Sequence, residues 1–197
     1  MVVEAPPKVC CVTGGSGLVG RRLVEMLAER GAKRVVSFDV APKPKGAKDA
    51  IKGCKIDYVQ ADLTKYDSVL EAFTGCECVW HIAALVGPYH DFNKYYDVNY
   101  KGTLNVIDAC KALGIRKIVM SSSPSTRFDG NDVIGKSVEE LDFPAEYTHA
   151  YAETKAMGER AMSAACDGEN LLTVAIAPHQ VYGPRDMLFL HNFLIAR

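Results

Sequence analysis

Short runs of apolar residues alternate with longer amphipathic segments along most of the chain. The apolar runs predict strands over residues 8–13, 34–40, 58–61, 77–83, 117–122 and 171–177. Between them, apolar residues recur at helical spacing and predict helices over residues 18–30, 67–73, 93–113 and 148–166. A further segment predicts the start of another helix over residues 187–197.

This alternation of strands and helices is typical of an α/β protein. Right-handed crossovers between parallel strands place helices on both faces of the sheet, so we expect a doubly wound parallel sheet of the Rossmann type. Residues 1–180 are expected to form this domain. Residues 181–197 are expected to begin a second, substrate-binding lobe that is largely absent from the chain.

The composition narrows the class of protein. Apolar residues make up 48% of the 197 residues and charged residues 24%, which is usual for a globular protein. Lysine and arginine total 23 against 24 acidic residues, so no excess of positive charge favours nucleic acid or anionic lipid. The seven cysteines lack the spacing of a zinc site, and no aliphatic run is long enough to cross a bilayer. We therefore expect a cytoplasmic protein with reduced thiols and no bound metal.

A glycine-rich turn joins the first predicted strand to the first predicted helix. Gly14, Gly17 and Gly20 have the G-x-x-G-x-x-G spacing of a dinucleotide-binding turn. Glycines there permit a tight turn, a close approach of the pyrophosphate, and close packing of helix against strand. The start of the following helix offers unpaired N–H groups to the phosphates.

An acidic residue, Asp39, stands at the end of the second strand, 19 residues after Gly20. A carboxylate at this place accepts a hydrogen bond from the ribose 2′-hydroxyl and repels a 2′-phosphate, so NAD is the expected cofactor. Lys43 and Lys45 follow closely, which keeps NADP as the alternative.

With these residues the chain resembles the extended branch of the short-chain dehydrogenase/reductase superfamily. Three motifs of this branch have counterparts here. Ala-Asp-Leu at 61–63 matches the motif on the adenine side, and His-Ile-Ala-Ala at 81–84 matches the motif at the end of the fourth strand. Val-Asn-Tyr-Lys-Gly-Thr at 98–103 matches the motif of the next helix. The resemblance covers residues 8 to about 190. Together with the glycine turn, it implies cofactor contacts from Gly14, Ser16, Gly17, Leu18, Val19, Gly20, Asp39, Asp62, Leu63, Ala83, Ala84, Asn99, Tyr151, Lys155 and Pro178.

Three stretches resemble the 3β-hydroxysteroid dehydrogenase group more closely, and within it the sterol-4α-carboxylate 3-dehydrogenase (decarboxylating) family. They read SSSPSTRFDG, YAETKAMGERAM and APHQVYGPRD. The resemblance implies oxidation of a 3β-hydroxyl on a sterol or steroid, and loss of carbon dioxide where a 4α-carboxylate lies beside the new ketone. Members of the family are considerably longer than this chain.

The expected chemical centre is a pair, Tyr151 and Lys155, placed one turn apart on one face of a predicted helix. A free tyrosine has a pKa of about 10, so it needs a neighbouring ammonium group and the positive nicotinamide to act as a base near neutrality. The resemblance selects Ser123 as the hydroxyl that orients the substrate alcohol, with Ser122 as the alternative. Asn99 is expected to help hold a water molecule for proton relay.

Three hypotheses on function stay open at this stage. The first is the hydroxysteroid-type dehydrogenase, with a small-molecule substrate and a possible homodimer. The second is a nucleotide-sugar epimerase or small-ketone reductase of the same superfamily. The third is a truncated, non-catalytic nucleotide-binding subunit of a larger assembly, which would leave apolar surface uncovered. A membrane anchor outside this chain would move the expected location to the surface of the endoplasmic reticulum.

Overall fold

The computed structural model describes residues 5–87, 90–186 and 189–195. Its strands are β1 (Val9–Thr13), β2 (Arg34–Asp39), β3 (Ala50–Ile51), β4 (Cys54–Gln60), β5 (Cys78–His81), β6 (Lys117–Ser121) and β7 (Leu172–Ile176). Its α-helices are α1 (Leu18–Glu29), α2 (Tyr66–Phe73), α3 (Phe92–Tyr95), α4 (Gly102–Leu113), α5 (Ala150–Ala165) and α6 (Phe189–Ile195). A π-helical turn, η1 (Tyr96–Lys101), and two 3₁₀ turns, η2 (Pro124–Arg127) and η3 (Val138–Glu140), complete the elements.

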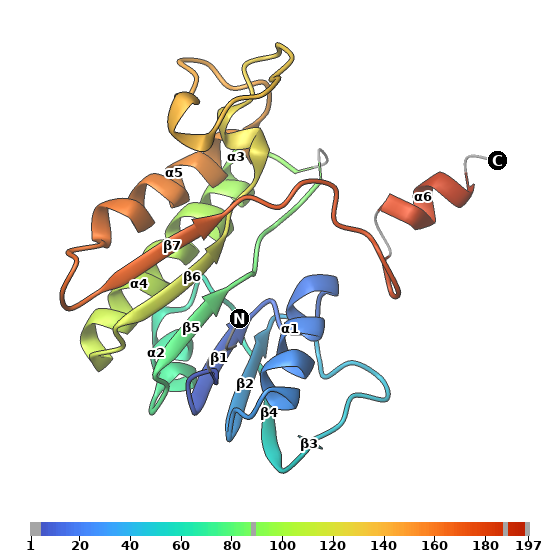
Figure 1. The fold of residues 1–197 in the computed structure, drawn as a ribbon, viewed down its shortest axis with the longest axis vertical. Coiled ribbons are helices and arrows are strands. Elements are labelled where there is room, and N and C mark those ends of the chain that lie inside the picture. The colour runs from blue at the N-terminus through green and yellow to red at the C-terminus, as the bar shows by residue number, and fades with distance from the viewer. Residues whose placement is uncertain (1–4, 88–89, 187–188, 196–197) are drawn as a thin grey trace.

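The strands form one sheet in the order β3-β4-β2-β1-β5-β6-β7, and every pairing is parallel except that of β3 with β4 (Figure 1). The chain reverses its direction of winding between β1 and β5. In an open parallel sheet, ligands bind outside the carboxyl ends of the strands at such a switch point. The expected α/β fold of Rossmann type is therefore confirmed, and it predicts where a site lies.

The two faces of the sheet pack against different helices. Helix α1 covers β1, β2 and β4 on one face, and α2, α4 and α5 cover the other (Figure 1). Strand β1 is buried on both sides, because Cys10 and Val12 point toward α1 while Cys11 joins the opposite cluster. Burial on both faces explains why this strand reads as a continuous apolar run rather than an alternating one.

Two features of the chain departed from the sequence expectations. The strand predicted over 58–61 begins earlier, at Cys54, because it forms a short antiparallel hairpin with β3 around Gly53, where φ is +81°. The helix predicted over 93–113 is divided into α3, η1 and α4 by a π-helical turn. Apolar periodicity does not report either feature, since a two-residue strand has no period and a π turn shifts the helix by a single residue. The boundary between domains at residue 180 remains a prediction.

Six of the seven cysteines are buried, and all seven are free. Cys10 and Cys78 are partners in the register of β1 and β5, yet burial raises the pKa of the Cys10 thiol to about 12 and that of Cys78 to about 11. Thiols held neutral in this way pack as small apolar side chains and are poor nucleophiles.

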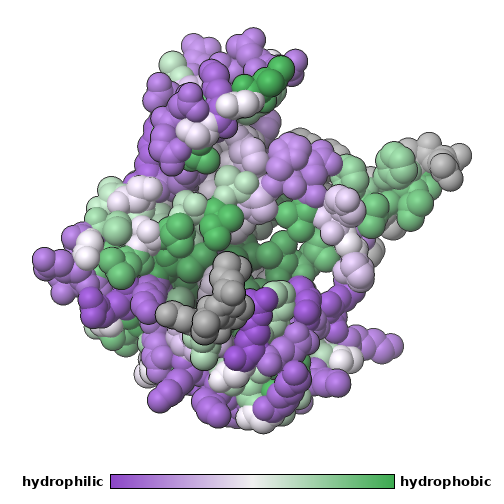
Figure 2. All heavy atoms as spheres, in the orientation of Figure 1, coloured by the Kyte–Doolittle hydropathy of each residue, from purple (hydrophilic) through white to green (hydrophobic). Residues whose placement is uncertain are grey.

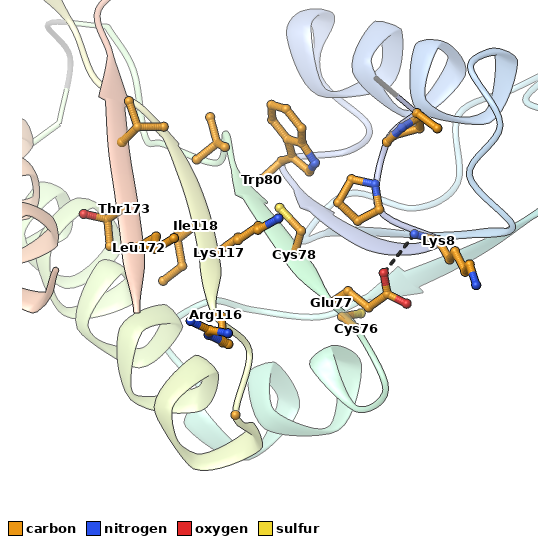
Figure 3. Close-up of a pocket in the computed structure, with 16 residues that line it drawn as sticks. Lys8, Cys76, Glu77, Cys78, Trp80, Arg116, Lys117, Ile118, Leu172 and Thr173 are labelled. Atoms are coloured by element: carbon orange, nitrogen blue, oxygen red, sulfur yellow. Dashed lines mark hydrogen bonds between the residues drawn. The ribbon is translucent and has the colours of Figure 1, made fainter. Parts of the chain in front are cut away.

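One area of the sheet lies open. Strands β5, β6 and β7 carry no helix of the described chain on the α1 side, and Leu172, Val174 and Ile176 are 40%, 49% and 54% exposed. Figure 2 shows a broad apolar surface in this region. A groove of about 860 Å³ runs across it, with Trp80 and Leu172 among its apolar walls and Lys8 and Glu77 at its edge (Figure 3). Apolar surface is thus left uncovered in the part of the chain that the structure describes.

Among the helices of the described residues, none combines the length and apolar character that a bilayer-spanning helix requires.

Candidate active site

The glycine turn between β1 and α1 is packed so closely that two of its residues admit no side chain. At Gly14, φ is +70°, and a Cβ would lie 2.8 Å from the backbone of Ala83. At Gly20, a Cβ would lie 2.0 Å from the carbonyl oxygen of Gly14. At Gly17 the nearest atom is 3.4 Å away, so this residue is open on its outer side. The tight turn, the open face and the close helix packing are the three conditions that a dinucleotide turn requires.

Helix α1 begins at Leu18, and its first intrahelical hydrogen bond runs from the Arg21 N–H to the Gly17 carbonyl, at 2.9 Å. The first-turn N–H groups, including those of Leu18, Val19 and Gly20, therefore lack partners within the helix and sit at its positive dipole end. These groups fit the pyrophosphate of a dinucleotide.

The carboxylate of Asp39 lies against this turn. One of its oxygens accepts a hydrogen bond from the Ser16 N–H and the other from the Ala41 N–H, both at 2.9 Å. Lys43, by contrast, binds Asp49 at 2.6 Å and lies over the ring of Tyr58. The negative charge at the expected ribose position is thus held in place, while the first of the two lysines is engaged elsewhere.

Replacing Asp39 by asparagine is expected to weaken discrimination against NADPH. The amide keeps the shape of the side chain but removes the charge that repels a 2′-phosphate. The ratio of the NADPH to the NADH dissociation constant should fall by about tenfold, which corresponds to about 1.4 kcal/mol. Fluorescence titration with each cofactor measures it, with Glu71→Gln on exposed α2 as the control, and an unchanged ratio would count against this role for Asp39.

The residues expected on the adenine and nicotinamide sides lie at the same edge of the sheet. Asp62 accepts the Thr64 N–H at 2.9 Å just after β4, and Leu63, which follows it, is buried. Ala83 and Ala84 follow β5, and the Ala83 N–H donates to the Thr13 hydroxyl at 3.2 Å. The fold therefore brings together the glycine turn, the Asp62 loop and the segment after β5.

His81 is a structural residue of this edge. It is 1% exposed, with Nδ1 2.9 Å from the Thr13 hydroxyl and Nε2 3.0 Å from the Thr103 hydroxyl. Because the Thr103 hydroxyl donates its proton to the Asn99 carbonyl, Nε2 carries the imidazole proton and Nδ1 accepts from Thr13. Burial, together with the nearby charge of Lys155, lowers the pKa of His81 to about 3.

This neutral histidine predicts a loss of stability in mild acid. The unfolded histidine has a pKa of about 6.5, so the unfolded chain binds the extra proton between pH 6.5 and 3 and stability falls as the pH falls through that window. At pH 5 the expected cost is about 2 kcal/mol relative to pH 7.5. Urea denaturation at both pH values measures it. The variant His81→Gln should lose this pH-dependent part of the free energy of unfolding, whereas His179→Gln, at an exposed position, should retain it. An equal loss of stability between pH 7.5 and pH 5 in both variants would contradict the assignment to His81.

The tyrosine and the lysine of the expected centre both lie on α5. Lys155 is 2% exposed, and its Nζ donates to the Ser121 carbonyl at the end of β6, at 2.7 Å. Burial lowers the pKa of Lys155 to about 8, although the carboxylate of Glu159 opposes that shift. Burial raises the pKa of Tyr151 above its ordinary value, while a hydrogen bond with the Ser123 hydroxyl lowers it. Among the neighbours of Tyr151, Ser123 rather than Lys155 is thus the group that favours its phenolate form.

The two serines after β6 have different surroundings. Ser122 is 5% exposed, and its hydroxyl donates to the carboxylate of Glu159. Ser123 instead contacts Tyr151, lies 2.9 Å from the Ser125 hydroxyl, and lines a large cavity. The geometry therefore favours Ser123 over Ser122 as the residue that meets a substrate.

Asn99 lies in the π-helical turn η1, and its side chain holds the segment after β5. Its amide accepts the Leu85 N–H at 2.8 Å, donates to the Leu85 carbonyl at 3.1 Å, and lies 3.4 Å from the Thr154 hydroxyl. These contacts occupy the amide with protein groups, so Asn99 positions the residues that follow Ala84. The role in water-mediated proton relay stays a prediction.

A cavity of about 1080 Å³ opens beside Ser123. Pro178, after β7, contributes to its wall together with the loop that follows η2. Its apolar walls come from Phe128, Val133, Val138, Leu141, Val181 and Phe189. A cavity of this volume and character suits a large apolar ligand.

The model of the 3-beta hydroxysteroid dehydrogenase/isomerase family matches residues 11–195. The chain belongs to this family. An Arabidopsis thaliana protein named 3beta-hydroxysteroid-dehydrogenase/decarboxylase isoform 1 is 36% identical over 204 residues, which cover 100% of this chain and 46% of that protein. Human sterol-4-alpha-carboxylate 3-dehydrogenase, decarboxylating, is 37% identical over 91% of this chain and 46% of its own length. The chain thus spans about half the length of these relatives.

Among solved structures, MoeE5 in complex with UDP-glucuronic acid and NAD superposes with a TM-score of 0.78 at 28% identity, over 95% of this chain and 60% of that one. The resemblance to the 3β-hydroxysteroid dehydrogenase group within the extended short-chain dehydrogenases is therefore confirmed.

Sequence reasoning missed two residues of the site, Glu159 and Arg127. Their ion pair, with 2.6 Å between Nη2 and Oε1, joins partly buried Arg127 at the end of η2 to buried Glu159 on α5. The spacing was visible in the sequence, because Tyr151, Lys155 and Glu159 follow one another at intervals of four on the same helix face.

Proposed function

We propose that this chain is the cofactor-binding and catalytic part of an NAD-dependent dehydrogenase that oxidises the 3β-hydroxyl of a sterol or steroid. The observation that carries the proposal is the convergence of Ser123, Tyr151 and the buried Lys155 where a large apolar cavity, lined by Ser123, meets the cofactor edge of the sheet. The Gly20 packing, the open N-terminus of α1 and the Asp39 carboxylate support NAD as the cofactor.

The residues divide the chemistry between them. Ser123 holds the substrate hydroxyl and stabilises the negative charge that develops on its oxygen. Tyr151 accepts the hydroxyl proton, and the positively charged nicotinamide of bound NAD⁺ would favour its phenolate form, with Lys155 one turn along the same helix. The glycine turn and Asp39 would hold NAD⁺, which would supply the acceptor for the hydride that leaves the carbinol carbon. Where the substrate carries a 4α-carboxylate, the new ketone makes it a β-keto acid, which loses carbon dioxide readily.

A sugar-nucleotide epimerase is the second candidate, since MoeE5 was solved with a UDP-sugar. A diphosphate requires free cationic or N–H donors in the substrate cavity. Arg127 lines the cavity, but its guanidinium is bound to Glu159 and to the Thr126 hydroxyl. The apolar walls and the engaged arginine favour the sterol over the nucleotide sugar.

A substrate panel tests the proposal. The purified chain is given NAD⁺ with 3β-hydroxysterols that carry or lack a 4α-carboxylate, with small secondary alcohols, and with UDP-sugars, while NADH formation and product masses are followed. We expect NADH with the sterols, and a product lighter by carbon dioxide with the carboxysterol. Epimerised UDP-sugar without net NADH would replace the proposal with the second candidate. NADH binding without turnover of any alcohol would favour a non-catalytic subunit.

The six buried free thiols support a location in the reducing cytoplasm.

A further inference from the structure

A buried carboxylate that the proposed chemistry does not use lies directly beneath the serine loop. Glu159 is 5% exposed. One of its oxygens pairs with the Arg127 guanidinium at 2.6 Å, and the other accepts from the Ser122 hydroxyl and lies 3.1 Å from the Thr126 hydroxyl. Burial raises the pKa of Glu159, but Arg127 and the two hydroxyls outweigh that effect and hold it below its ordinary value. The group is therefore ionised at neutral pH.

The partners of Glu159 lie on both sides of Ser123. Ser122 immediately precedes it, and the Thr126 hydroxyl lies 2.8 Å from the Ser123 carbonyl oxygen. Arg127 reaches the same hydroxyl at 2.9 Å. Since Glu159 is part of α5, its carboxylate joins the loop that carries Ser123 to the helix that carries Tyr151. The distance between the Ser123 and Tyr151 hydroxyls therefore depends on the contacts that Glu159 makes.

Glu159 also stands one turn beyond Lys155 on α5. The groups that face Lys155 are the Ser121 carbonyl at the end of β6, neutral His81 from β5, Tyr151 on its own helix, and the Glu159 carboxylate. Arg127 pairs with the same carboxylate. The Glu159 carboxylate is thus paired with partly buried Arg127 and acts electrostatically on buried Lys155, so removing it would take a negative charge away from both cations.

We propose that Glu159 is a positioning residue of the active site, whose carboxylate fixes the Ser123 loop against α5 and places a buried negative charge one helical turn from Lys155. The proposal rests on the proposed dehydrogenase function for its kinetic part only. Its electrostatic part concerns Lys155 alone and needs neither cofactor nor substrate.

Two substitutions separate the two roles. Glu159→Gln keeps the reach of the side chain and removes its charge, whereas Glu159→Asp keeps the charge and shortens the reach by one methylene. Glu153→Gln, on the same helix and without a buried ion pair among the described contacts, is the matched control. Lysine labelled at Cε allows the titration of Lys155 to be followed by NMR, with its signal assigned by its absence in Lys155→Met.

The expected sign follows from the charges. Glu159 raises the pKa of Lys155, which is about 8, so Glu159→Gln should lower that pKa by about one unit. The pH at which activity declines on the alkaline side of its profile should then fall by the same amount. Turnover in both Glu159 variants should fall by about 10- to 100-fold, with KM and NADH affinity little changed, because the serine loop no longer holds Ser123 against Tyr151. In Glu159→Asp the Lys155 titration should stay near its original value.

A merely structural role would lower the melting temperature without moving the Lys155 titration in the folded variant, and that result would overturn the proposal. Wild-type kcat in a folded Glu159→Asp would overturn the loop-fixing part. If Glu159→Gln fails to fold, the double variant Glu159→Gln with Arg127→Met removes both charges of the ion pair, and it should fold but keep the reduced kcat. Failure of the wild-type chain to oxidise any alcohol would refute the proposed function. The Lys155 titration would then still test the electrostatic part of the proposal for Glu159.

Discussion

Replacing Tyr151 by phenylalanine is expected to reduce turnover by about 10²- to 10⁴-fold, the range that a positioned general base contributes. The substitution removes only the hydroxyl that we propose accepts the substrate proton, and whose pKa the Ser123 hydroxyl lowers. The ring keeps its edge-on contact with Tyr95, at 6.1 Å between centroids, so the helix and the cofactor edge stay in place. NADH affinity should change by less than about threefold. Steady-state kinetics and a cofactor titration on the same preparation measure both quantities.

Tyr147 provides the matched control. It is partly buried, and its hydroxyl has no hydrogen-bond partner within the described chain. Tyr147→Phe should therefore retain the turnover of the unmodified chain. Retained turnover in Tyr151→Phe would remove the tyrosine from the chemistry and, with it, the reason to regard α5 as the catalytic helix.

Replacing Gly20 by alanine is expected to disrupt the dinucleotide turn. The added Cβ would lie 2.0 Å from the Gly14 carbonyl oxygen and 2.6 Å from its carbon, and these backbone atoms cannot rotate away as a side chain does. The free energy of unfolding should fall by about 1–3 kcal/mol, as expected for an overpacked site. NADH affinity should fall at least about tenfold, because the Gly14 carbonyl must move and the turn with it. Urea denaturation and NADH titration measure the two effects.

Gly17→Ala distinguishes packing from binding. A Cβ at Gly17 has ordinary contact with the Gly14 carbonyl, and the backbone φ of −74° suits any residue. This variant should keep its stability to within about 0.5 kcal/mol yet bind NADH more weakly, since a methyl group would stand where the pyrophosphate approaches the backbone. Equal stability in Gly20→Ala and Gly17→Ala would contradict the account of this turn.

The sequence was sufficient for the parts of the fold that repeat a simple pattern. Six apolar runs separated by amphipathic helices predict a doubly wound parallel sheet, and the structure has it. The glycine spacing predicts the turn because each glycine answers a local steric demand that the neighbouring strand and helix create. The place of Asp39 at the end of β2 follows from the same local order of elements.

The remaining features depend on contacts between distant segments, which local patterns do not encode. His81 reads as a lone histidine, and only the placement of β5 beside β1 and α4 reveals its burial between the hydroxyls of Thr13 and Thr103. Arg127 and Glu159 are 32 residues apart in the sequence, and only the fold brings them together as an ion pair with Glu159 buried. Burial raises the pKa of Tyr151. The sequence alone shows that Lys155 lies one turn away, but it does not show how deeply the tyrosine is buried.

The most direct test of the central claim, that this chain forms an NAD-selective dinucleotide site at its active centre, is a titration with NADH and then NADPH. Energy transfer from the single tryptophan, Trp80 on β5, reports binding at the cofactor edge. We predict saturable transfer with NADH and weaker transfer with NADPH, because Asp39 repels the 2′-phosphate. The absence of saturable transfer with either cofactor, from a chain shown to be folded, would contradict the claim.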